Sequence, residues 1–164
     1  MKHRWRYWWV WLLVAAYIAF IFHNSLEVAA ASDSLSYAVA EKILRVMQRF
    51  SLYSSDTSLF NHYVRKAAHF TEFAGLGFLV SFAMHCCPLF KYRILNFTLF
   101  LVAIPFADET IQKFVDGRSS QITDMLIDGG GFLAGAFFCY VLILVILDLA
   151  GYIQRGKPEK HSEV

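Results

Sequence analysis

Three short segments of the chain combine carboxylates, basic residues and a histidine at helical spacing. In the first, Arg65, His69 and Glu72 follow one another at intervals of four and three residues, so they share one face of a helix. A carboxylate beside a histidine can orient the imidazole while the ring takes up or releases a proton. His69 and Glu72 are therefore predicted to be the candidate catalytic acid/base pair.

The other two segments supply the remaining carboxylates of the candidate site. Asp108 lies four residues before Gln112, and Asp124 lies four residues before Asp128, so each pair shares a helix face. Basic side chains near these groups, arginine above all, are suited to binding phosphate or carboxylate. The predicted ligand-binding residues are Arg65, Lys66, Asp108, Glu109, Gln112, Arg118, Asp124 and Asp128.

The same residues leave two other interpretations open. His69, Glu72, Asp108 and Asp128 offer one nitrogen and several oxygens, a set that suits Mg²⁺, Mn²⁺ or Ca²⁺ better than structural zinc. No cofactor is predicted, and a bound Mg²⁺ or Mn²⁺ ion is the alternative. A structural network of ion pairs between helices would also use such residues, although five carboxylates outnumber the three basic side chains near them.

The composition sets the environment in which these groups act. Of the 164 residues, 57% are apolar and 17% charged, and the mean hydropathy is +0.45. A soluble domain is about 45–50% apolar and about 25% charged, so a membrane protein is indicated. The net charge of +2 is too small to indicate nucleic-acid binding, and three cysteines cannot form a disulfide framework.

The apolar residues fall into four blocks, which predicts an all-α membrane protein. The chain is expected to form a single transmembrane domain over residues 1–150, followed by a polar cytoplasmic tail at 151–164. The expected spans are about 6–23, 64–87, 92–112 and 124–148, with an amphipathic extracytoplasmic helix at about 34–50 and a loop over 51–61. The 34–50 helix could lie on the membrane surface or cover the outer loops, and the first block also resembles a cleavable signal peptide.

The distribution of lysine and arginine favours an orientation with both termini in the cytoplasm. Eight of these residues then lie on the inner side and seven on the outer side. In this topology the start of the second span, the end of the third and the start of the fourth face outward. All the predicted site residues therefore converge on one outward-facing polar cavity.

Small residues in the second and fourth spans predict close helix packing. Gly75 and Gly77 would let a neighbouring helix approach, and Gly131 and Gly135 have the small-xxx-small spacing of membrane helix contacts. Four spans make a small protomer, so a homodimer is left open.

Taken together, the three polar segments resemble the VanZ-like family. The motifs are Arg65-Lys66-x-x-His69-Phe70-x-Glu72-Phe73, then Asp108-Glu109-x-x-Gln112-x-Phe114-x-x-x-Arg118, then Asp124-x-x-x-Asp128-x-x-Gly131. The resemblance covers about residues 5–148. Two positions differ from the family pattern, which often has Tyr at position 73 and Asn at position 128.

The resemblance implies a multi-pass protein of the bacterial cytoplasmic membrane, linked to reduced susceptibility to teicoplanin-type glycopeptides. The expected function is binding or processing of a lipid-linked or phosphate-bearing envelope molecule. A membrane enzyme using His69 and Glu72, with or without a metal, is the alternative, and whether the protein is an enzyme is left open. The expected partners are membrane lipids and a lipid-linked cell-wall precursor or glycopeptide, and no nucleic acid.

Overall fold

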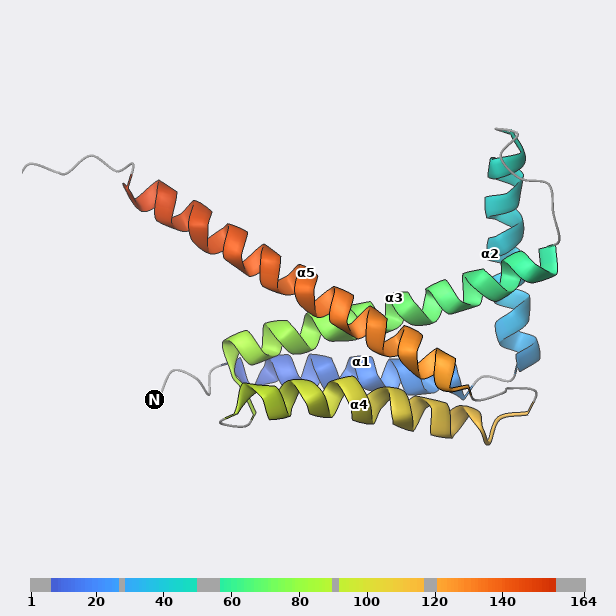
Figure 1. Ribbon diagram of the computed structural model, residues 1–164, viewed down its shortest axis with the longest axis horizontal. Coiled ribbons are helices and arrows are strands. Elements are labelled where there is room, and N and C mark those ends of the chain that lie inside the picture. The colour runs from blue at the N-terminus through green and yellow to red at the C-terminus, as the bar shows by residue number, and fades with distance from the viewer. Residues whose placement is uncertain (1–6, 27–28, 50–56, 90–91, 117–120, 156–164) are drawn as a thin grey trace, which may run out of the picture.

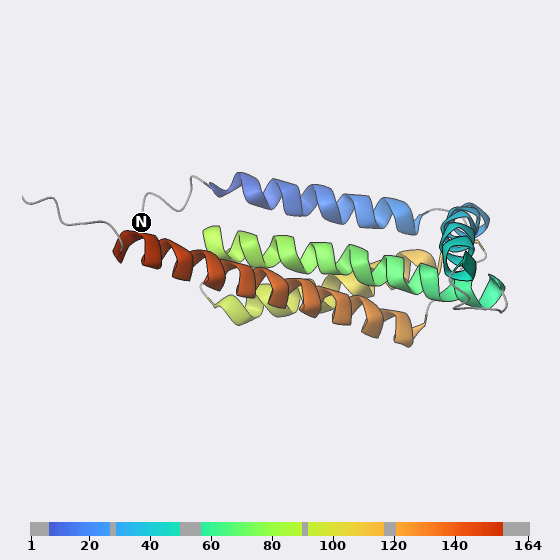
Figure 2. The ribbon, with the colours of Figure 1, turned by 90° about the horizontal axis from the view of Figure 1, so that it is seen from above.

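The computed structural model describes residues 7–26, 29–49, 57–89, 92–116 and 121–155, and over these ranges the chain is almost entirely helical. Its five helices are α1 (Trp9–Ser25), α2 (Ala29–Arg49), α3 (Thr57–Cys86), α4 (Arg93–Gln112) and α5 (Ile122–Arg155). Helices α1, α3 and α4 run along one another, whereas α5 crosses α3 and diverges from the others toward its C-terminal end (Figures 1 and 2). The expected all-α fold is confirmed.

The crossing of α3 and α5 is the most extensive helix contact in the fold. A Cβ atom added at Gly77 of α3 would overlap the backbone carbonyl of Phe132, and one added at Gly135 of α5 would overlap that of Ala74. The two backbones therefore touch without intervening side chains, as small residues permit in membrane helices. The predicted close packing at Gly77, Gly131 and Gly135 is confirmed, whereas Gly75 faces Tyr17 of α1.

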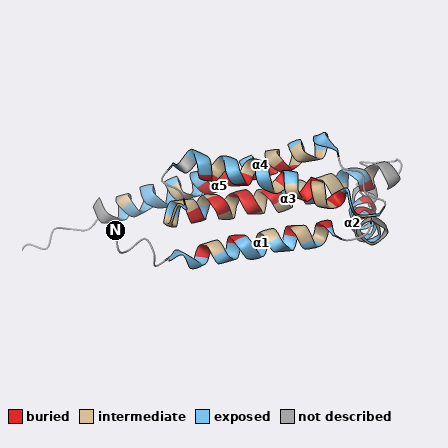
Figure 3. Cartoon of the chain, turned by 90° about the horizontal axis from the view of Figure 1, so that it is seen from below, coloured by how far each residue is buried: buried red, intermediate tan, exposed pale blue. Residues whose placement is uncertain are grey.

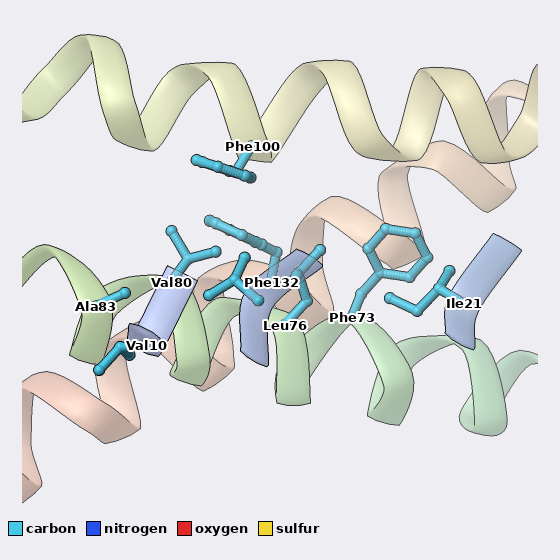
Figure 4. Packing of buried hydrophobic residues seen from close by; sticks show 9 residues of the cluster. Val10, Ile21, Phe73, Leu76, Val80, Ala83, Phe100 and Phe132 are labelled. Atoms are coloured by element: carbon cyan, nitrogen blue, oxygen red, sulfur yellow. The ribbon is translucent and has the colours of Figure 1, made fainter. Parts of the chain in front are cut away.

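An apolar cluster holds α1, α3, α4 and α5 together (Figure 4). Phe73, Leu76 and Val80 of α3 are fully buried at its centre, and Phe132 of α5 packs among them. The Trp11 indole nitrogen donates a hydrogen bond of 2.7 Å to the carbonyl of Cys87, which ties the start of α1 to the end of α3. Packing of the bundle thus rests on apolar contacts along its length.

The helix surfaces that face away from the core of the bundle are apolar as well. Exposed Leu, Phe, Ile and Val side chains cover α1, α4 and most of α5 (Figure 3). Within the described ranges, three helical segments are long and apolar enough to cross a membrane: Phe60–Cys86, Ile94–Gln112 and Ile122–Ile153. Helix α1, with 17 residues, lies at the lower limit of about 17 for a spanning helix. Three of the four expected spans are therefore supported by length and composition.

Several helices extend beyond their predicted ends. Helix α3 begins at Thr57, so the part of the expected 51–61 loop that the structure describes is helical, and α2 begins at Ala29 rather than near 34. Helix α5 continues through Gly151 to Arg155, into the expected tail. Polar residues at these ends suggested loops, but a helix that already satisfies its backbone can extend past the apolar block.

Helix α2 lies across the axis of the bundle at the end where α3 begins (Figure 1). Its apolar residues Ala40 and Leu44 are buried, while Glu41 and Arg45, about 100° further around the helix, form an exposed ion pair of 2.9 Å. The predicted amphipathic helix is thus present, and it packs against α3.

Candidate functional site

Four helix ends meet at the end of the bundle that carries α2: the last turn of α1, the first half of α3, the last turns of α4 and the start of α5 (Figure 1). These ends bring together a group of polar side chains that we call the polar cluster. Its members are Asn24, Ser25, Lys66, His69, Glu72, Asp108, Glu109, Gln112, Asp124 and Asp128.

Asp108 lies at the centre of the polar cluster and is fully buried. Its Oδ1 atom accepts a hydrogen bond from the Ser25 hydroxyl of α1, and its Oδ2 atom accepts one of 2.8 Å from the Gln112 amide one turn along α4. These two donors fix the orientation of the carboxylate. The helical spacing of Asp108 and Gln112 predicted their proximity.

A histidine and two carboxylates from three different helices lie near one another in the cluster. One possible ligand atom from each of His69, Asp108 and Asp128 lies within 4.8 Å of the other two. These residues belong to α3, α4 and α5, so their grouping depends on how three helices pack. Asp128 is 1% exposed, and within the described part of the chain neither of its carboxylate oxygens has a hydrogen-bond partner.

Glu72 makes a contact with the first helix. Its Oε1 atom accepts a hydrogen bond of 2.8 Å from the side-chain amide of Asn24 on α1. This contact joins α3 to α1 within the polar cluster. Whether His69 and Glu72 act as an acid/base pair stays a prediction.

Lys66 and Asp124, both predicted to bind a ligand, form an ion pair with each other. Lys66 Nζ and Asp124 Oδ1 lie 2.7 Å apart, and their side chains are 24% and 23% exposed. Because Lys66 precedes His69 by three residues and Asp124 precedes Asp128 by four, the ion pair lies about one helical turn outside the buried group. It joins α3 to α5 at the partly exposed rim of the cluster.

Glu109 connects the end of α4 to the beginning of α5 through a hydrogen bond. Its Oε2 atom accepts a hydrogen bond of 3.0 Å from the backbone N–H of Gln121, the residue just before α5. Backbone N–H groups at a helix start have no partner within the helix, so a carboxylate there is favourable. This contact gives Glu109 a role in positioning α5, and with it Asp124 and Asp128.

Of the remaining predicted site residues, the structure describes all but one. Arg65 is half-buried on α3, one turn before His69. Arg118 falls outside the described residues. Glu109, Gln112 and Asp128 are each at most 5% exposed, whereas the side chains of Lys66 and Asp124 are about one quarter exposed.

Two members of the cluster, Asn24 and Ser25, were not predicted. They directly follow the apolar block of the first helix, and Ser25 is 1% exposed. The signal was available: if the second span begins on the outer side, the first must end there, so polar residues at that end can join the others. Asn24 and Ser25 are uncharged and lie outside the three charged motifs, so the motifs did not indicate them.

An apolar groove of about 510 Å³ lies away from the polar cluster. It is bordered by the second half of α3 at Ser81 and His85, by Phe97 of α4, and by α5 from Leu133 to Leu147. It lies in the half of the bundle where α5 diverges from α4 (Figure 1).

Together, the fold and the cluster define an all-helical membrane protein with a buried polar site at one end of its bundle. The family model described as VanZ/LLP1 matches residues 8–146, a range that includes every member of the polar cluster. The chain therefore belongs to the VanZ/LLP1 family and is a cell-envelope-associated membrane protein, as its motifs predicted. No curated protein and no solved structure matches it.

Proposed function

We propose that this protein binds a lipid-linked or phosphate-bearing molecule of the bacterial cell envelope at the polar cluster. In this proposal four helices span the cytoplasmic membrane, both termini are cytoplasmic, and the cluster faces outward. Helix α1 is the fourth span, since its 17 residues extend about 25 Å toward the roughly 30 Å of the hydrocarbon core. The crosswise position of α2 suits a helix at the outer membrane surface.

The observation that carries the proposal is the burial of two carboxylates beside a histidine where packing does not require them. The apolar cluster already joins α1, α3, α4 and α5. An ionisable group within a membrane bundle is costly and marks function more often than scaffolding. Asp108 and Asp128 are at most 1% exposed, and they belong to different helices.

The rim of the cluster offers a route for an anionic head group. The Lys66–Asp124 ion pair is partly exposed, so a phosphate could compete with Asp124 for the ammonium group. Arg65 is adjacent in sequence and supplies a guanidinium, which binds phosphate through two parallel hydrogen bonds. If the phosphate replaced Asp124 as the partner of Lys66, the ion pair between α3 and α5, one turn from His69, would be broken.

The apolar groove supports a lipid as the bearer of that phosphate. It begins at Leu133, nine residues and about 13.5 Å along α5 from Asp124 at the rim, and continues to Leu147. Its lining is almost entirely apolar, with Ser81 and His85 as exceptions. A hydrocarbon chain could occupy this groove while its head group lies at the rim.

The test measures binding of a polyprenyl phosphate to the purified protein in detergent, with the polyprenol of equal chain length as the matched ligand. Native mass spectrometry gives both affinities. Loss of one charge-assisted hydrogen bond costs about 1.5–3 kcal/mol, so Arg65→Ala or Lys66→Ala should weaken phosphate binding about 10- to 100-fold. Arg45→Ala, on the exposed face of α2, should leave it unchanged.

Two results would contradict this proposal. Equal affinity for the polyprenol and its phosphate would show that the phosphate is not recognised. If Arg65→Ala and Lys66→Ala fail to accumulate as folded protein while Arg45→Ala accumulates normally, the basic residues stabilise the bundle, and the alternative of a structural ion-pair network is favoured.

Catalysis on the same lipid is a second candidate function, supported by the position of His69 beside two carboxylates. Hydrolysis of polyprenyl phosphate would release inorganic phosphate, which a colorimetric assay measures. His69→Gln should then abolish release while phosphate-dependent binding persists. Binding without any release in the unaltered protein would exclude this reaction.

The association with teicoplanin-type glycopeptides follows from family resemblance and is proposed here as a consequence of lipid binding. Expression in a susceptible bacterium should raise the teicoplanin concentration that inhibits growth, and Lys66→Ala should remove the effect at equal membrane abundance. A glycopeptide as the direct ligand would instead appear as binding of purified protein to teicoplanin alone.

A further inference from the structure

We infer that His69, Asp108 and Asp128 form a binding site for one divalent cation of the Mg²⁺ or Mn²⁺ type. The three side chains come from α3, α4 and α5 and place an imidazole nitrogen and two carboxylate oxygens within 4.8 Å of one another. The site does not depend on the lipid proposed above, because the cation alone can be tested.

The main argument for a bound cation is the environment of Asp128. Its side chain is 1% exposed, and within the described residues both of its oxygens lack a hydrogen-bond partner. An ionised carboxylate removed from water without a partner costs several kcal/mol. A second buried carboxylate, Asp108, adds to this cost through repulsion. A divalent cation between the two carboxylates would offset both the cost of removing Asp128 from water and the repulsion from Asp108.

Asp108 has the hydrogen bonds expected of a metal ligand. Ser25 and Gln112 each donate to one of its oxygens. A carboxylate oxygen has two lone pairs, so accepting one hydrogen bond leaves a lone pair available for a cation. Hydrogen bonds of this kind hold the ligands of metal sites in place. In this site Ser25 and Gln112 orient Asp108.

The spacing of the ligands requires only a modest closure. Ligand atoms about 2.1–2.2 Å from an octahedral cation lie roughly 3.0 Å apart when adjacent and about 4.3 Å apart when opposite. The present limit of 4.8 Å exceeds the distance between opposite ligands by about 0.5 Å and that between adjacent ligands by at most about 1.8 Å. Rotation of the unpartnered Asp128 side chain about its own bonds can supply that movement.

The ligand types select among cations. One nitrogen with carboxylate oxygens suits Mn²⁺ and Mg²⁺, whereas structural zinc sites are richer in cysteine and histidine. Three protein ligands leave further positions of an octahedral ion open to water or to an oxygen of a bound phosphate. The Lys66–Asp124 pair lies one turn outside these positions.

The experiment uses the full-length protein in detergent, stripped with EDTA and titrated with Mn²⁺. Electron paramagnetic resonance follows free Mn²⁺, and elemental analysis gives the bound ratio. We expect one Mn²⁺ per chain, displaced by excess Mg²⁺. Asp128→Asn, which keeps the side-chain shape, should weaken Mn²⁺ binding by more than about 100-fold, and Ser25→Ala by about 10-fold. Asp148→Asn, at the exposed far end of the same helix, should bind normally.

Thermal unfolding of the same samples separates loss of a ligand from loss of the fold. Mn²⁺ should raise the melting temperature of the unaltered protein and leave that of Asp128→Asn unchanged. If Asp128→Asn does not fold, His69→Gln serves as the second variant with the same expected losses. No Mn²⁺ bound at about 1 mM, the weak limit of functional divalent sites, would overturn the inference. Binding that survives both ligand substitutions would overturn it too, and a proton shared by the two aspartates would then explain their burial.

Discussion

The two halves of the bundle are built from the same helices but differ in how those helices meet. In the half that carries the polar cluster, α3 and α5 are in backbone contact at Gly131 and Gly135, and polar side chains from four helices form hydrogen bonds. In the other half α5 diverges, and an apolar groove lies between α3, α4 and α5 (Figure 1).

This difference follows from the distances that the two kinds of interaction tolerate. A hydrogen bond weakens sharply when its atoms separate by a few tenths of an ångström, whereas a lipid tail can fill an apolar gap of varied width. A polar site within a membrane bundle therefore needs helices held at fixed separation. The glycine contacts provide this, which makes the crossing of α3 and α5 a precondition for the polar cluster.

The largest effect is expected from breaking the glycine contact. A side chain at Gly135 would meet the carbonyl of Ala74 and force the helix backbones apart, so Gly135→Leu should cost about 3 kcal/mol or more. Thermal unfolding followed by tryptophan fluorescence measures the loss. Gly151→Leu, on the same helix with no atom within 4 Å of an added Cβ, should keep the original melting temperature. Equal losses in both variants would show that the crossing has no special role.

A smaller effect is expected from removing one hydrogen bond in the polar cluster. Ser25→Ala leaves a buried carboxylate oxygen of Asp108 without its donor, which should lower the free energy of unfolding by about 1.5–3 kcal/mol. Ser81→Ala, in the lining of the apolar groove, should change the free energy of unfolding by less than about 0.5 kcal/mol. Comparable losses for the two serines would contradict the distinction between the halves.

The smallest effect is expected from narrowing the groove. Leu144→Trp adds bulk to its lining and should weaken polyprenyl phosphate binding a few-fold, since a tail loses part of its contact. The comparison is Leu126→Trp, a 72% exposed position at the other end of α5, which should leave lipid affinity unchanged. An unchanged affinity in Leu144→Trp would mean that the tail lies elsewhere. Mn²⁺ binding should be the same in both variants.

The sequence predicted the helices better than their ends. Apolar blocks located α3, α4 and α5, because a helix in lipid must be apolar over most of its length. The ends of α3 and α5 were placed several residues too far inward, at Val64 and Asp148. Hydropathy marks where the apolar region stops, but a helix continues until its backbone hydrogen bonds are interrupted, which polar residues do not require.

For the site, helical spacing correctly related residues on one helix and was weaker between helices. Asp108 and Gln112 are hydrogen-bonded as their four-residue spacing predicts. The partner of Asp108 on α1, Ser25, is 83 residues away, and no periodicity connects the two. Likewise, no spacing in the sequence shows that Asp108 and Asp128, on two other helices, come within 4.8 Å of His69.

By itself, the sequence determined that the chain is an all-helical membrane protein with polar groups gathered at one end, because composition and periodicity are local properties. It also determined the close approach at Gly77 and Gly135, since only small residues permit it. The tertiary structure alone decided which polar groups meet. That depends on how each helix is rotated about its axis and on which neighbour it contacts, and a rotation of one residue turns a side chain by about 100°.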